Sequence, residues 1–147
     1  MVKDFEQLEH TADLQIKVYG STLTELFKNS LNGMFQMMHP NSSHCVYNNN
    51  RITCSALTRI RTVGANSPDL NALLVDFLSY ALYLSDIHNE AYFDVTFTIF
   101  TSQSVVGDLH GVPVTGFNQS EVKAVTYHNL NIVQHEGLWQ THIVFDI

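Results

Sequence analysis

Apolar and polar residues alternate strictly along the first patterned segment of the chain, residues 14–19. The apolar members fall on one side of an extended chain and the polar members on the other: Leu14, Ile16 and Val18 against Gln15, Lys17 and Tyr19. This period of two predicts a strand with one buried face. Asp13 continues the polar side, and Gly20 ends the run.

A repeat of apolar residues at three- and four-residue steps follows, and it predicts a helix with one buried face. Its members are Leu23, Leu26, Phe27, Leu31, Met34, Phe35 and Met38. Thr22 and Glu25 have the spacing of a capping box, in which a hydroxyl and a carboxylate satisfy amides of the first turn. We expect the helix to end at His39-Pro40, because proline disfavours a helical conformation in the residue before it.

A second helix is predicted after Ser67-Pro68-Asp69. This tripeptide offers a cap residue, a proline suited to the first helical position and an early negative charge. The buried stripe of the helix is expected to consist of Leu70, Leu73, Leu74, Phe77, Leu78, Ala81 and Leu82. The apolar pattern ends near Asp86.

Strand-like segments fill most of the remaining chain. They are residues 45–47 and 52–54 around a turn at 48–50, then 91–100, a hairpin near Gly107 and Gly111, 122–127, 129–134, a turn at Glu136-Gly137, and 138–145. Helices do not alternate regularly with these strands, which disfavours a doubly wound parallel sheet. The expected class is α+β, with two amphipathic helices packed on a largely antiparallel or mixed β-sheet in a single compact domain over residues 1–147.

Composition limits the classes of partner. The 147 residues are 45% hydrophobic and 14% charged, as in a globular chain, and 14 acidic against 7 basic residues give a net charge of −7. Such a charge repels phosphate backbones, so strong direct nucleic-acid binding is not expected. A cation or a basic protein suits the chain better, although a local basic patch around Arg51, Arg59 and Arg61 stays open.

The two cysteines, Cys45 and Cys54, have neither the Cys-x-x-Cys spacing of redox motifs nor a second pair for a zinc ribbon. We expect ordinary free thiols, packed or partly packed, and a core that needs no disulfide. The start of the chain has no apolar signal core, and no stretch is expected to reach the roughly 20 apolar residues of a membrane span. No membrane association and a cytoplasmic, reducing setting are therefore expected.

Several motifs of known chemistry are missing from the sequence. There is no glycine-rich phosphate loop, no Gly-x-Ser-x-Gly elbow and no His-Glu-x-x-His zinc helix. The eight histidines are scattered without metal-ligand spacing, and each taken singly is more often a surface or structural residue.

Two aspartates near the two chain ends are the strongest chemical signal. Asp13 precedes the first predicted strand, and Asp146 follows the last strand, one residue before the end of the sequence. If these strands meet, both carboxylates converge with the terminal carboxylate, a set of oxygens that suits Ca²⁺ or Mg²⁺ rather than zinc. Taken alone, Asp13 also suits a capping or turn role and Asp146 a frayed end.

A second candidate group is Lys123 and His128, in a strand-like segment of the second half. These side chains could orient carboxylates or contact a phosphate of a partner. The alternative is an edge strand with a protective lysine, and the residues alone do not decide between the two.

Taken together, these segments resemble the archease family over nearly the whole chain. The resemblance is carried by Glu9-His10-Thr11-Ala12-Asp13 and the strand to Gly20, by Thr22-Leu23-x-Glu25-Leu26-Phe27 with Gly33-Met34-Phe35, by residues 73–78, by residues 122–128 and by Val144-Phe145-Asp146-Ile147. Gln15 departs from the glycine usual in the family, and residues 102–112 match no family pattern.

The resemblance implies a protein that is not itself an enzyme and that assists the RtcB-type RNA ligase of tRNA splicing and RNA repair. It implies a divalent cation, Ca²⁺ first with Mg²⁺ or Mn²⁺ as alternatives, held by Asp13, Asp146 and Ile147. It also implies that His10, Lys123 and His128 face the partner or support the metal ligands.

Two other functions are weighed against this one. A chaperone or RNA-processing adaptor ranks second, because the helical stripes look fully used by the core and leave no large apolar patch. A metal-dependent hydrolase with His10 or His128 as base ranks third, because no nucleophile arrangement is recognisable.

Overall fold

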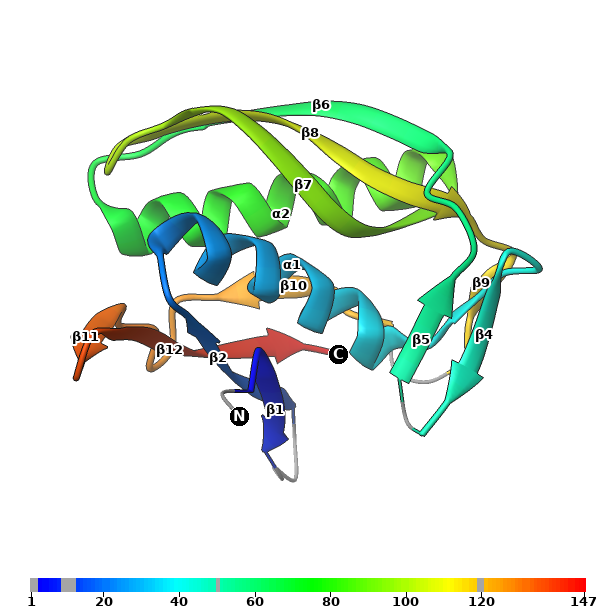
Figure 1. Cartoon of the computed structure of the whole chain (residues 1–147), viewed down its shortest axis with the longest axis horizontal. Helices are drawn as coiled ribbons and strands as arrows, with labels where there is room; N and C mark the ends of the chain where they lie inside the picture. Colours follow the sequence, from blue (N-terminus) through cyan, green and yellow to red (C-terminus); the bar gives the residue numbers. More distant parts are fainter. Residues whose placement is uncertain (1–2, 9–12, 50, 119–120) are drawn as a thin grey trace.

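Two helices lie between two antiparallel sheets in the computed structural model, which describes residues 3–8, 13–49, 51–118 and 121–147 (Figure 1). The elements in chain order are β1 (Phe5–Leu8), β2 (Leu14–Gly20), α1 (Leu23–Met38), β3 (Pro40–Asn41), β4 (Cys45–Asn48), β5 (Arg51–Cys54), β6 (Arg59–Asn66), α2 (Leu70–His88), β7 (Glu90–Phe100), β8 (Ser104–Pro113), β9 (Gly116–Phe117), β10 (Ala124–Thr126), β11 (Val133–His135) and β12 (Leu138–Asp146). The α+β class is confirmed.

The strands divide into two main sheets rather than one. The first has the order β1-β2-β12-β10, with β11 also paired to β12, and the second has the order β6-β8-β7. The short pairs β3–β9 and β4–β5 stand apart, and every strand pair within the described residues is antiparallel. Helix α1 contacts β2 and β7, and α2 contacts β6 and β10, so each helix touches both sheets.

Helix α1 begins and ends where the sequence predicts. The Thr22 hydroxyl accepts a hydrogen bond from the Glu25 amide at 3.1 Å, while the Glu25 carboxylate accepts from both the amide and the hydroxyl of Ser21. His39 ends the helix in the left-handed conformation, with φ at 51°. Most of the predicted stripe is fully buried, including Phe27 and Phe35.

Helix α2 corrects the sequence prediction in two respects. Asp69, not Ser67, is the N-cap and accepts from the Ala72 amide at 2.9 Å, whereas the Ser67 hydroxyl donates to Asp76. The 19 residues of α2 are also long and apolar enough, by length and composition alone, to cross a membrane, which we did not expect of any stretch. A helix that contacts two sheets needs apolar residues on more than one side, and this accounts for the buried part of its apolar residues.

Two strand predictions in the second half need revision, and one turn prediction holds. Gly107 and Gly111 lie inside β8 rather than in a hairpin turn, because the turn after β7 falls at residues 101–103. Of the strand predicted at residues 129–134, only residues 133 and 134 pair, as part of β11 (Val133–His135). The turn at Glu136-Gly137 is confirmed, with φ values of 53° and 79°.

Cys45 and Cys54 form a disulfide, so the prediction of free thiols is wrong. The register of the β4–β5 hairpin places the two residues directly opposite each other, with Cα atoms 4.0 Å apart. The spacing of the cysteines could not reveal this register, because it depends on the turn that joins the strands. The side chain of Gln36 further holds the hairpin by bonding both the amide and the carbonyl of Ile52.

Replacing both cysteines by serine is expected to lower the free energy of unfolding by about 2–3 kcal/mol, because the crosslink closes a short loop and restricts the unfolded chain. Urea unfolding of the oxidised protein and of Cys45→Ser/Cys54→Ser measures the difference. A reducing agent should shift the midpoint of the wild type to that of the variant and leave the variant unchanged. Equal midpoints for oxidised and reduced wild type would contradict the prediction.

Candidate functional site

The pairing of β2 with β12 brings the two chain-end aspartates to one corner of the first sheet. The last paired residues of these strands are Leu14 and Phe145. Asp13 immediately precedes Leu14, and Asp146 immediately follows Phe145, so the antiparallel register sets the two aspartates opposite each other. Opposed residues of neighbouring strands hold their Cβ atoms about 4.5–5.5 Å apart.

Asp146, the last residue of β12, points away from the helices, and Asp13 lies in the bend just before β2. Leu14 and Phe145 pack in the core, and successive side chains of a strand point to opposite faces. Asp13 is half-buried and its Oδ1 atom is inaccessible to solvent, whereas Asp146 is exposed. The corner therefore combines one sheltered and one open carboxylate.

Strand β10 completes this corner from the other side of β12 (Figure 1). Ala124 pairs with Asp146, and the Lys123 amide donates a hydrogen bond to the Asp146 carbonyl oxygen at 2.8 Å. Ile147 follows with 42% of its surface exposed. We call the region formed by Asp13, Asp146 and Ile147 the carboxylate corner; Lys123 borders it.

The two predicted histidines are placed differently. His128 is exposed and its amide bonds the Thr126 hydroxyl, so it lies past the end of β10 that is remote from Lys123. His10 lies outside the described residues. The structure thus brings Asp13, Asp146, Ile147 and Lys123 together, and it does not bring His128 to them.

The carboxylate corner suits a hard cation by its donor chemistry. Asp13 and Asp146 offer carboxylate oxygens and Ile147 offers main-chain oxygen, the ligand types that Ca²⁺ and Mg²⁺ prefer. Among residues 3–8, 13–49, 51–118 and 121–147, no cluster of three or more His, Cys, Asp or Glu side chains could hold a metal. Further oxygens would have to come from water or from a partner, as is usual for Mg²⁺ and tolerated by Ca²⁺.

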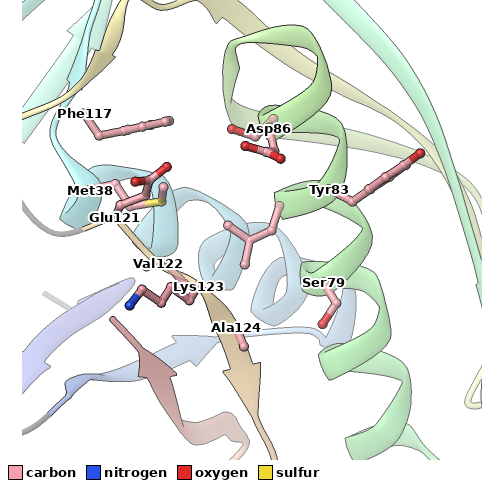
Figure 2. Close-up of a pocket in the computed structure, with 11 residues that line it drawn as sticks. Met38, Ser79, Tyr83, Asp86, Phe117, Glu121, Val122, Lys123 and Ala124 are labelled. Atoms are coloured by element: carbon pink, nitrogen blue, oxygen red, sulfur yellow. The ribbon is translucent and has the colours of Figure 1, made fainter.

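A pocket of about 540 Å³ lies beside Lys123, and the sequence analysis did not find it (Figure 2). Its walls come from the end of α1, the second half of α2, β9 and residues 121–124. No signal in the sequence could have revealed it, because residues 38, 79–86, 117 and 121–124 meet only in the folded chain.

Comparison with known proteins identifies the family. The model of the archease protein family (MTH1598/TM1083) matches residues 5–147. The chain belongs to the archease family.

Individual relatives support this assignment along the whole chain. "Protein archease" of Pyrococcus furiosus is 31% identical, over 99% of this chain and 100% of the relative. "Protein archease" of Methanosarcina acetivorans is 30% identical, over 99% and 97%. These archease names describe a protein and specify no reaction.

Two solved structures share the fold. The solution structure of Methanobacterium thermoautotrophicum protein 1598 has a TM-score of 0.74 and 27% identity, covering 99% of this chain and 100% of the other. The crystal structure of an archease, possible chaperone, from Thermotoga maritima has a TM-score of 0.62 and 17% identity, covering 97% and 96%. The family resemblance predicted from the sequence is confirmed.

Proposed function

We propose that this archease-family protein is a non-catalytic, cation-binding cofactor of an RtcB-type RNA ligase. It stimulates guanylylation and repeated turnover of the ligase in tRNA splicing and RNA repair. Membership of the archease family supports the general assignment, and the opposition of Asp13 and Asp146 across β2 and β12 is the observation that carries it. The ligase acts in the cytoplasm in this proposal.

The cation is held by the carboxylates of Asp13 and Asp146 and by main-chain oxygen of Ile147. We favour Ca²⁺, with Mg²⁺ or Mn²⁺ as alternatives, because all donors are oxygens. When bound, the cation supplies positive charge that can neutralise nucleotide phosphates at the ligase site. The exposure of Asp146 and Ile147 leaves one side of the cation accessible to a partner.

Lys123 supports this corner through its main chain. Its amide fixes the Asp146 carbonyl, so the end of β12 is held between β2 and β10 rather than frayed. In this proposal its exposed side chain contacts the partner, and His128 contacts the partner on a surface beyond the corner. His10, which lies outside the described residues, is proposed as a further partner contact. The net charge of −7 favours a protein surface over bare RNA as the contact.

Asp13→Asn and Asp146→Asn are each expected to weaken Ca²⁺ affinity by at least about tenfold, because each removes a charged ligand. Calorimetric titration measures cation affinity, and formation of guanylylated ligase with Ca²⁺, Mg²⁺ or Mn²⁺ measures stimulation. Both variants should lose most of the stimulation and keep the wild-type unfolding midpoint.

Glu136→Gln provides the matched control, because it removes the same charge at the opposite end of β12. It should bind cation and stimulate the ligase as the wild type does. Full stimulation by both aspartate variants would overturn the proposal.

The second candidate is a chaperone or RNA-processing adaptor. It is favoured by the description of the Thermotoga maritima relative as a possible chaperone. Suppression of the aggregation of unrelated unfolded proteins, without any effect on ligase guanylylation, would support this function instead. A metal-dependent hydrolase ranks third and would require phosphoester turnover by the isolated protein.

A further inference from the structure

The pocket beside Lys123 combines an apolar floor with an acidic rim. Met38 and Val122 are almost fully buried, at 2% and 6% exposure, and Phe117 is half-buried. Asp86 of α2 and Glu121 of the segment before β10 are exposed and line the same pocket. Its volume of about 540 Å³ falls in the range of pockets that enclose a ligand or a large side chain.

The two carboxylates of the rim are not neutralised by the part of the chain that the structure describes. Neither Asp86 nor Glu121 forms an ion pair or a side-chain hydrogen bond there. Lys123 also lines the pocket, but its ammonium points away from Asp86 and α2 (Figure 2). The pocket therefore presents uncompensated negative charge above an apolar base.

We propose that this pocket binds an arginine side chain of a partner protein. The methylene stem would lie along Met38 and Val122, because long cationic side chains bury their stems on apolar surface. The planar guanidinium can stack on Phe117 and donate paired hydrogen bonds to carboxylates, which a lysine ammonium cannot do equally well. A phosphate-bearing ligand is disfavoured, because two carboxylates would repel it.

The surroundings of the pocket are those of a protein interface. Tyr80, Tyr83 and Ile87 on the outer side of α2 are exposed by 41%, 59% and 49%. Tyrosine is enriched in interface cores, and Tyr80 and Tyr83 lie edge to face with ring centroids 6.2 Å apart. A partner that places arginine in the pocket would cover these side chains as well.

The pocket and the carboxylate corner share a wall. Lys123 and Ala124 line the pocket, and the same two residues hold Asp146 through the Lys123 amide and the Ala124 pairing. One partner could therefore contact both sites. That this partner is the RNA ligase rests on the proposed function, whereas the capture of arginine does not.

Titration of the full chain with N-acetyl-arginine-methylamide, followed by NMR, tests the pocket directly. Chemical shifts should change at Ser79, Leu82, Phe117 and Ala124, with affinity on the order of millimolar for one side chain. The citrulline analogue has nearly the same shape without the charge, and it should shift these residues at least about tenfold less at equal concentration. Added salt should weaken the arginine response.

Asp86→Asn/Glu121→Gln should weaken binding of the arginine probe by at least about tenfold, because both acceptors lose their charge. Glu6→Gln/Glu136→Gln removes two charges from β1 and from the β11–β12 turn, and it should bind as the wild type does. Equal responses to the arginine and citrulline probes, or wild-type binding by the pocket variant, would overturn the proposal.

The ligase assay separates this inference from the proposed function. The pocket variant should require a higher concentration for half-maximal stimulation while keeping wild-type Ca²⁺ affinity, because the carboxylate corner is intact. If the wild type fails to stimulate the ligase but binds the arginine probe, only the proposed function falls. If stimulation is normal and the probe does not bind, only the arginine pocket falls.

Discussion

Replacing Glu90 by alanine is expected to lower the free energy of unfolding by about 3 kcal/mol. Glu90 is 2% exposed, and its carboxylate accepts hydrogen bonds from Nε and Nη2 of Arg61 and from the Tyr92 hydroxyl, each at 2.8 Å. Removing the carboxylate leaves the Arg61 charge and the buried Tyr92 hydroxyl without their acceptor. Denaturant unfolding at neutral pH measures the loss.

Arg59→Gln is the matched control, because Arg59 also reaches Glu90 but from 3.6 Å and with half of its side chain exposed. Its replacement should cost less than about 1 kcal/mol, as for surface ion pairs. A loss as large as that of Glu90→Ala would show that general charge balance, and not the paired contact with Arg61, stabilises this region.

The same carboxylate should contribute to acid sensitivity. Burial alone would raise the pKa of Glu90, but the hydrogen bonds from Arg61 and Tyr92 outweigh it and hold the pKa below its ordinary 4.5. A carboxyl whose folded pKa is depressed stabilises the fold above the unfolded pKa, and this contribution is lost as pH falls through the folded value. Glu90→Gln should therefore lose less stability than the wild type between neutral pH and about pH 3.

Local structure was predictable from local pattern. The apolar period of α1, its Thr22 cap and the alternation of β2 each depend on residues close in sequence, and the structure confirms them. The cap of α2 was misassigned by two residues, because Ser67 and Asp69 are both good cap types and only Asp69 has the geometry to reach the Ala72 amide.

Long-range register was the part that pattern could not supply. The Cys45–Cys54 disulfide depends on the β4–β5 register, and the pocket depends on four segments that meet only after folding. Helix α2 is apolar on more than one side and contacts strands of both sheets. We looked for a single buried stripe in the sequence and therefore expected one sheet. The proximity of Asp13 and Asp146 was the one long-range feature that the sequence suggested. The two aspartates flank the first and last predicted strands, and they meet if those strands pair.

Gly111→Ala is expected to lower the free energy of unfolding by about 3–5 kcal/mol, because losses of this size are typical of severe packing conflicts. Gly111 lies in the central strand β8, between Arg59 of β6 and Tyr92 of β7. An added Cβ would overlap the Ala91 carbonyl oxygen and approach the Tyr92 ring atom Cδ1 to 2.7 Å. The main chains of β7 and β8 cannot move apart at this point without breaking hydrogen bonds of the β7–β8 ladder. Movement of Tyr92 would also disturb its hydrogen bond to Glu90.

Gly64→Ala is the matched substitution for Gly111→Ala, because Gly64 lies in β6 of the same sheet. A Cβ there meets the Val105 oxygen at 3.8 Å and Val106 Cγ2 at 4.0 Å, which are ordinary contacts. This variant should be neutral or more stable by up to about 1 kcal/mol, because alanine reduces the freedom of the unfolded chain. Thermal unfolding should therefore give a lower midpoint than the wild type for Gly111→Ala and an equal or higher midpoint for Gly64→Ala. Equal midpoints for the two variants would contradict the prediction. They would show that the β7–β8 pairing accommodates a side chain at position 111 without loss of stability.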